Sequence, residues 1–193
     1  MPIVQMIEKE LPPNRAQALR FGLWIAMASI CMLFGAFTSA YLVRKPVGNW
    51  YEFKLPVLFF YSTISMVISS LFLEKAFRSY KKNVISGFKR NLSLGFILGV
   101  VFIVLQIMAW KAMVGQGLFI DLNVSVSFLY VISGIHALHV IGGLVAFLIS
   151  VLVHNTRTFS PDPMKILKLD LLRQYWHFVG ILWIYLLVFL ILQ

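Results

Sequence analysis

Five apolar runs, each long enough to cross a lipid bilayer, are the feature of this sequence that most restricts its fold. A membrane-spanning helix needs about 20 consecutive, mostly apolar residues. The runs lie at approximately 19–43, 55–76, 91–113, 124–153 and 172–192. Because the hydrocarbon core of a bilayer offers no water to backbone N–H and C=O groups, each run should form a helix. We therefore predict an all-α integral membrane protein, a bundle of five transmembrane helices that forms a single membrane domain over residues 1–193.

The composition supports this prediction, and the charges give an orientation. The chain is 60% hydrophobic and 12% charged, whereas soluble domains are about 45–50% apolar and about 25% charged. A net charge of +10 would suggest nucleic acid as a partner of a soluble protein. Here the basic residues lie between apolar runs, where they direct topology and contact anionic lipid, so we expect membrane lipids and no nucleic acid. Of the 17 lysines and arginines, 13 lie on the side that includes the N-terminus. The positive-inside rule then predicts the N-terminus inside and the C-terminus outside.

The spans lack the central carboxylates that are typical of proton pumps and ion-coupled transporters. We expect all seven Asp and Glu residues to lie at helix ends or in loops. The single cysteine, Cys31, cannot form an internal disulfide and is interpreted as a small hydrophobic residue. The first 17 residues carry Glu8 and Glu10 and no long apolar run, unlike a secretory signal or a transit peptide. We therefore expect a protein of the bacterial inner (plasma) membrane.

Small and weakly polar residues within the spans predict close packing of helices. Gly95 and Gly99 are four residues apart in the third run, and Gly142 and Gly143 are adjacent in the fourth. Several serines in the second run can bond to their own backbone or to a neighbouring helix. Gln106, near the middle of the third run, should bond across to another helix.

Histidines in the last two runs are the strongest candidates for a functional site. His136 and His139 lie at positions i and i+3 of the fourth run, so they share one face of a helix. His177 lies near the start of the fifth run, directly after Trp176 and about one helical turn after Arg173. We predict that these residues form a lipid-binding or interhelical polar cluster, and that the chain has no catalytic or metal-binding residue.

Three interpretations of the histidines are open from the residues alone. Ligation of heme or a metal ion would need partners on facing helices, and no carboxylate or thiolate is at hand to complete such a site. Contact with lipid headgroups would use His and Arg to bind phosphate oxygens. Hydrogen bonding between helices, without any ligand, would satisfy imidazoles that are costly to bury alone.

Four motifs in order along the chain resemble subunit III of the heme–copper respiratory oxidases, the cytochrome c and quinol oxidases. They read 20-RFGLWIAMAS-29, 105-LQIMAW-110, 134-GIHALHVIGG-143 and 175-YWHFVGILW-183. The resemblance covers the chain from its first span to the C-terminus. Its five spans are similar to the shorter form of the family, which lacks the first two helices of the seven-helix form. The positions of the three histidines, of Trp176 and of Asp170 match the family pattern.

The resemblance implies an accessory, non-catalytic subunit of a terminal oxidase in aerobic respiration. In that family, subunit III carries no redox centre and packs against subunit I, which holds the hemes and copper. It also holds phospholipids in a cleft and supports proton uptake and stable oxygen reduction. The implied cofactor of this chain is therefore bound phospholipid alone, with hemes and copper in partner subunits. Subunit I is the implied main contact among the oxidase subunits, and a larger respiratory supercomplex is left open.

The sequence also departs from the family pattern. Three acids of the family fall on Ile30, Ala109 and Gly180, so roles that depend on those acids do not transfer. Two alternatives to an oxidase subunit stay open. One is a subunit III-like accessory protein of a nitric oxide reductase, and the other, from a different class, is a b-type heme-binding membrane anchor. The choice between cytochrome c and quinol as electron donor is not readable from the chain.

Overall fold

The computed structural model describes residues 13–48, 50–51, 54–156 and 163–192. Within these ranges the chain forms five long α-helices, one short 3-10 helix and no strand. The elements are α2 (Pro13–Arg44), η1 (Lys45–Val47), α3 (Leu58–Lys81), α4 (Ile85–Gly115), α5 (Val124–Thr156) and α6 (Pro163–Leu192). Each of the five α-helices is long and apolar enough to cross a membrane. The predicted all-α chain with five candidate spans is therefore confirmed.

Several helices extend beyond the apolar runs. α3 ends at Lys81 instead of residue 76, and α6 begins at Pro163 instead of residue 172. The start of α6 at Pro163 is a common one, because proline lacks only an N–H that would have no partner at the first position of a helix. Because α3 and α6 are longer than expected, Glu74 and Asp170 lie about two turns inside them. The expectation that every acid lies at a helix end or in a loop was too simple for these two residues, because it rested on shorter helices.

Two helix ends are closed by residues in the left-handed backbone conformation. Asn83 follows α3 with φ of +58°, and the N–H of Val84 donates to the carbonyl oxygen of Ser79. Gly117 follows α4 with φ of +78°. Both ends have the hydrogen-bond pattern of a Schellman motif, which satisfies the last carbonyl groups and stops the helix. The stop after α3 turns the chain at once into α4, so the two helices form an antiparallel hairpin.

Small side chains let α3 and α4 approach closely. Ser69 Oγ donates to the carbonyl oxygen of Gly95 at 2.6 Å. A Cβ atom at Gly95 would lie 3.3 Å from the backbone oxygen of Ser69, a tight contact that glycine avoids. Gln106 Nε2 donates to Ser62 Oγ at 3.1 Å, which confirms that Gln106 bonds across to another helix.

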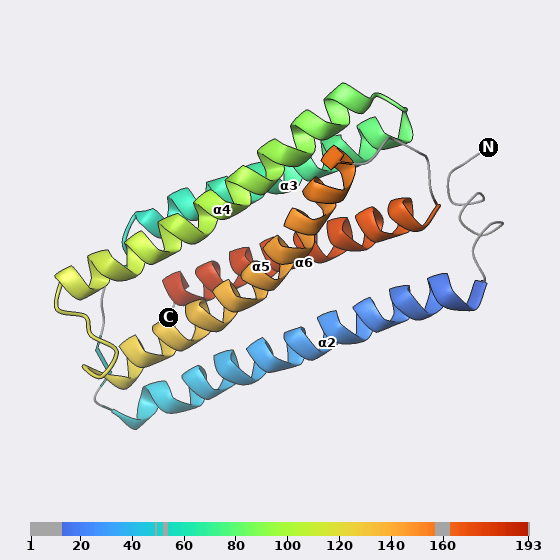
Figure 1. The fold of residues 1–193 in the computed structure, drawn as a ribbon. Coiled ribbons are helices and arrows are strands. Elements are labelled where there is room, and N and C mark those ends of the chain that lie inside the picture. Colours follow the sequence, from blue (N-terminus) through green and yellow to red (C-terminus); the bar gives the residue numbers. More distant parts are fainter. Residues whose placement is uncertain (1–12, 49, 52–53, 157–162, 193) are drawn as a thin grey trace.

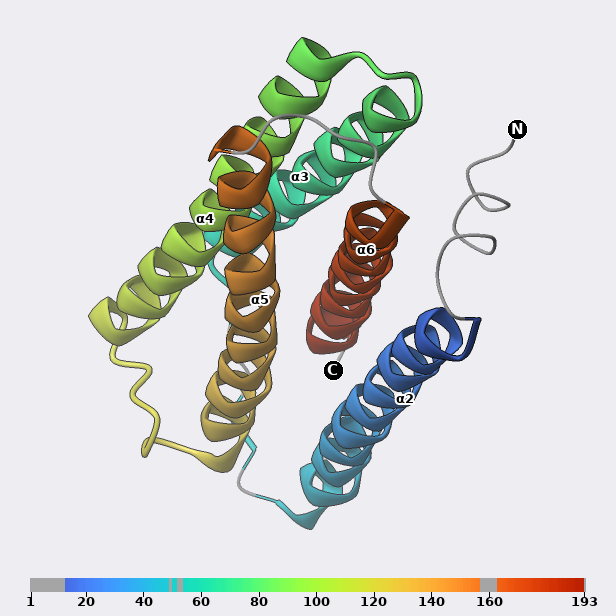
Figure 2. The same cartoon turned by 45° about the vertical axis from the view of Figure 1, so that its right-hand side comes forward.

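α6 lies between α2 and the α3–α4 hairpin (Figure 2) and packs against α2, α3 and α5. It supplies the largest buried side chains of the bundle, Trp176 and Trp183. In Figure 1 the five helices run roughly alongside one another, with α2 (blue) at the edge of the bundle. The core therefore surrounds α6, and side chains on different faces of α6 meet different helices.

α2 is attached mainly through its C-terminal half. Phe34 is fully buried there, and Thr38 Oγ1 lies 3.1 Å from the hydroxyl of Tyr185 on α6, within hydrogen-bond distance. Its N-terminal half contributes only Ala16 to the described buried residues, and Phe21 and Trp24 there are 69% and 64% exposed. This uneven attachment leaves room for a groove beside the N-terminal half of α2.

Candidate functional site

The predicted polar cluster consists of five residues, namely His136, His139, Arg173, Trp176 and His177. The structure places these residues in three different environments. Arg173 and His177 belong to a charged network between α3 and α6. Trp176 packs in the core against α3, α4 and α5. His136 stacks on Trp183, which is about 15 Å farther along α6 than Arg173, at 1.5 Å of rise per residue. The five residues, which come from α5 and α6, therefore do not form one cluster.

Trp176 fills a space that two glycines leave open. The side chain is fully buried, and its Nε1 donates to Ser69 Oγ at 3.1 Å. A Cβ at Gly99 of α4 would lie 2.7 Å from Trp176 Cζ2, and one at Gly143 of α5 would lie 3.1 Å from Cζ3. Close packing at Gly99 and Gly143 is thus confirmed, whereas Gly142 has no atom within 4 Å of such a position. Trp176 is a packing residue that joins three helices to α6.

Arg173 is bound by two carboxylates. Its Nη1 donates to Glu74 Oε2 of α3 at 2.9 Å, and its Nη2 and Nε donate to Asp170 Oδ1 at 2.8 and 3.1 Å. The guanidinium carbon also lies 4.5 Å from the ring centroid of Phe77, a favourable cation–π distance. The three charged side chains are 17–27% exposed, so solvent screens them only partly. This arrangement holds the guanidinium in one place and links α6 to α3.

Glu74 is the centre of this charged network. Besides Arg173, its carboxylate accepts a hydrogen bond from Arg78 Nε at 2.9 Å, and His177 Nε2 lies 3.6 Å from Oε2. Arg78 is 72% exposed, so its contribution is that of a weak surface pair. Arg173 is the only one of these partners whose hydrogen bond joins two helices, and it is the partner most important for the fold.

The two histidines of α5 have different surroundings despite their shared face. His136 is fully buried, and its ring lies 5.0 Å from that of Trp183 with an interplanar angle of 27°. His139 is half-buried, and its Nδ1 is 2.8 Å from the carbonyl oxygen of Ile135 in its own helix. The backbone of His139 also accepts a hydrogen bond from the Tyr175 hydroxyl at 3.0 Å. Neither ring contacts the charged network.

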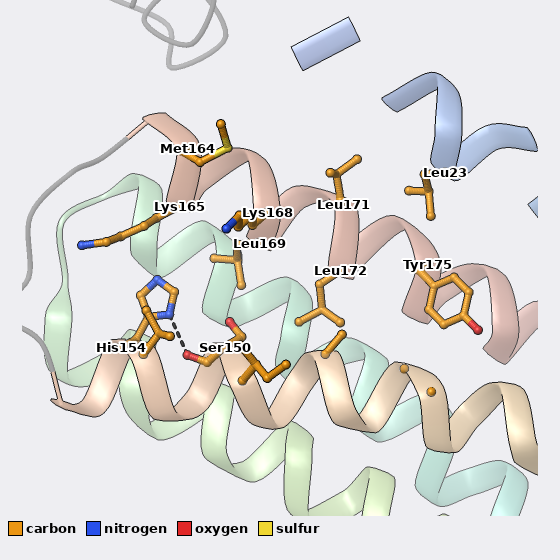
Figure 3. Close-up of a pocket in the computed structure, with 15 residues that line it drawn as sticks. Leu23, Ser150, His154, Met164, Lys165, Lys168, Leu169, Leu171, Leu172 and Tyr175 are labelled. Atoms are coloured by element: carbon orange, nitrogen blue, oxygen red, sulfur yellow. Dashed lines mark hydrogen bonds between the residues drawn. The ribbon is translucent and has the colours of Figure 1, made fainter. Parts of the chain in front are cut away.

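A groove of about 750 Å³ lies between α5 and α6, with Leu23 of α2 at its edge (Figure 3). Its lining is mostly apolar. Figure 3 shows Lys165 and Lys168 near His154 at one end, and Tyr175 toward the other end. A volume of this size is within the range of about 300–1,000 Å³ that is typical of small-molecule sites. The groove is therefore an apolar slot with positive charge at one end.

The described residues contain no group of three or more His, Cys, Asp or Glu side chains placed to hold a metal ion. The three positions at which the family pattern has acids, Ile30, Ala109 and Gly180, are buried here. Ala109 is fully buried and Ile30 is 9% exposed. A Cβ at Gly180 would meet Ser70 Oγ at 3.5 Å and Met66 Cγ at 3.7 Å, both ordinary contacts.

Comparison with known proteins gives the family. A family model described as cytochrome c oxidase subunit III matches residues 46–192, from η1 to the end of α6. The chain belongs to this family. Probable cytochrome c oxidase subunit 3 of Nocardia farcinica is 29% identical over 181 residues, covering 89% of this chain and 86% of that protein. Cytochrome bo(3) ubiquinol oxidase subunit 3 of Buchnera aphidicola is 26% identical over 193 residues, covering 97% and 98%. Cytochrome c oxidase subunit 3 of Thermostichus vulcanus is 27% identical over 170 residues, covering 84% and 81%.

Two features of this subunit III chain were missed by reasoning from the sequence. Glu74 was treated as a helix-end acid, although it is the interhelical partner of Arg173. Glu74 and Arg173 are both expected near the same membrane surface. Their opposite charges at a similar depth could have suggested that they form an ion pair. The groove was missed as well. The spacing of Lys165 and Lys168 at i and i+3 places them on one face of a helix, but nothing in the sequence said that α5 would face them.

Proposed function

We propose that this chain is the accessory, non-catalytic subunit III of a heme–copper terminal oxidase in aerobic respiration. The observation that carries the proposal is the match of a cytochrome c oxidase subunit III family model to residues 46–192. Relatives include a subunit 3 of a cytochrome c oxidase and a subunit 3 of a ubiquinol oxidase, so both kinds of electron donor occur among them. The chain is an integral protein of the bacterial inner membrane, and it associates with the other subunits of its oxidase. Hemes and copper belong to those partners.

Two finer parts of the proposal concern placement in the complex. The N-terminus lies inside and the C-terminus outside. The reason is that 13 of the 17 lysines and arginines are expected on the same side of the membrane as the N-terminus. Subunit I is the main contact. Support for this comes from the family and from the apolar side chains that every span leaves exposed, since in a membrane these face either lipid or another subunit.

The α5–α6 groove is the proposed site of a bound phospholipid. Lys165 and Tyr175 mark its two ends and are ten residues apart on α6, which is about 15 Å at 1.5 Å per residue. That length is half of a hydrocarbon core of about 30 Å, so the groove matches one acyl chain of one leaflet. The lysine end then lies at headgroup depth, where ammonium groups bind phosphate. The phosphate contact is assigned to Lys165 and Lys168, because both line the groove and Arg173 does not.

Purification through an affinity tag on this chain tests the main proposal. We expect a heme–copper subunit I to copurify in mild detergent, together with oxygen reduction that requires an electron donor. Copurification of a nitric oxide reductase instead would support the alternative complex. A heme Soret band in the isolated chain, lost on replacing His136 or His139, would support the b-type anchor and contradict the proposal.

Lipid content of the purified complex tests the groove. The double variant Lys165→Gln/Lys168→Gln should lose about one anionic phospholipid per complex in native mass spectrometry, because lysine binds phosphate as a point charge. The matched control is Lys75→Gln/Lys82→Gln, which removes the same charge from α3 and the turn after it and should keep its lipid. Equal lipid content in the two variants would contradict the assignment.

A further inference from the structure

His136 lies where no protein group of the described residues meets its ring nitrogens. The side chain is fully buried, and its ring stacks on Trp183 at a centroid distance of 5.0 Å. The rings of Phe34 and Phe102 lie edge-on to it at 6.2 and 6.0 Å. Neither Nδ1 nor Nε2 has a hydrogen-bond partner among the residues that the structure describes. A polar ring is therefore enclosed by aromatic side chains.

An imidazole in this position needs two hydrogen-bond partners. A neutral histidine has one ring nitrogen that donates and one that accepts. Its ring neighbours are apolar, so the charged form would be buried without a counterion, which is very costly. Most buried polar groups in proteins are satisfied by protein or by ordered water. Because no described protein group meets the His136 ring nitrogens, ordered water is the partner that can satisfy them.

A second unsatisfied group lies on the facing helix. Gln106 is 1% exposed, and its Nε2 donates to Ser62 Oγ of α3. Its Oε1 is buried and has no partner in the described part of the chain. Phe102, whose ring contacts that of His136, is one turn before Gln106 on α4, so the two share a face of that helix. Gln106 Oε1 and the His136 ring are thus two unpartnered polar groups on helices that meet at Phe102.

We propose that this subunit binds ordered water between Gln106 and His136. The water donates to Gln106 Oε1 and accepts from the N–H of the His136 ring, and a second water can serve the other ring nitrogen. Buried waters typically make about three hydrogen bonds to groups that would otherwise be unsatisfied. With Ser62 bonded to Gln106, the water completes a polar layer that connects α3, α4 and α5 beneath Trp183 of α6. Neither Gln106 nor His136 lines the lipid groove.

A structure of the intact oxidase complex, at a resolution that shows ordered water, tests this proposal directly. We expect a density peak about 2.7–3.2 Å from Gln106 Oε1 and from one ring nitrogen of His136, the normal range of hydrogen-bond lengths. A dry region between the two side chains would overturn the proposal. A direct hydrogen bond between them, without a peak, would overturn it as well.

Thermal stability of the complex gives a second test. The variants are Gln106→Leu, His136→Phe and the double variant, compared with Gln106→Leu combined with His139→Phe as a matched control. We expect the fall in Tm of the double variant to be smaller than the sum of the two single falls, because the two groups share one water. The His139 ring bonds within its own helix. The falls in Tm caused by Gln106→Leu and His139→Phe should therefore add up in the control variant. Additive losses in both pairs would overturn the proposal.

Discussion

Replacing Gly99 by alanine measures how tightly Trp176 fills the space between α4 and α5. The new Cβ would lie 2.7 Å from Trp176 Cζ2 and 2.9 Å from Leu144 Cδ2, whereas carbon atoms pack best at about 3.5–4.0 Å. The indole cannot easily retreat, because its Nε1 is bonded to Ser69 Oγ. Overpacking of a buried site costs about 1–3 kcal/mol, and alanine recovers about 0.5–1 kcal/mol of helix stability relative to glycine. The difference predicts a net loss of about 0–2.5 kcal/mol in the free energy of unfolding, with its midpoint at about 1 kcal/mol.

Unfolding of the purified chain in mixed micelles of mild detergent and SDS, followed by circular dichroism, measures this loss. Gly142→Ala is the matched control, since no atom lies within 4 Å of its Cβ position, and it should leave stability equal or slightly higher. In a Trp176→Phe background, Gly99→Ala should cost less, because phenylalanine lacks the indole atoms that the new Cβ meets. If Gly99→Ala raised stability as much as Gly142→Ala, the close contact inferred here would be refuted.

Three further predictions concern polar contacts and one turn, and the same SDS titration measures each. Ser69→Ala removes the acceptor of the Trp176 indole N–H and should cost about 1–3 kcal/mol, the penalty of a buried unsatisfied donor; an unchanged midpoint would contradict this. Glu74→Gln removes the charge that binds Arg173 and should cost about 1.5–3 kcal/mol. That loss should persist in high salt, because the pair is only partly exposed, and a loss abolished by salt would argue for a surface pair. Asn83→Val should cost about 1–2 kcal/mol, because Asn83 has a left-handed backbone, whereas Asn83→Gly should be neutral; equal midpoints would refute the turn argument.

The candidate site was harder to predict from the sequence than the spans. His136, Arg173 and Trp176 were singled out from the sequence because polar and aromatic side chains stand out against an apolar background. Their grouping into one cluster depended on distances along and between helices. Arg173 pairs with Glu74, which is 99 residues away in the chain. No local pattern determines which helix faces which, so that pairing could not be read from the motifs.

The groove and the polar layer illustrate the same limit. Lys165, Lys168 and His154 form one end of a groove only because α5 and α6 lie side by side while the N-terminal half of α2 stands apart. Gln106 was expected to bond across helices, and it does so through its amide nitrogen. That no described protein group meets its oxygen follows from the rotation of α4 about its axis, which hydrophobicity alone leaves nearly free in lipid.

The sequence by itself determined that the chain is helical, that it has five candidate spans, and that its motifs are those of an oxidase subunit III. These follow from local physics, since apolar length requires a helix in lipid, and from the order of short motifs. Only the tertiary structure decided that Trp176 fills the space beside Gly99, that Glu74 binds Arg173, and that His136 is enclosed by aromatic rings. Helices in a membrane associate through close packing and a few hydrogen bonds and not through the hydrophobic effect. Their rotation and pairing therefore depend on contacts between residues far apart in the chain.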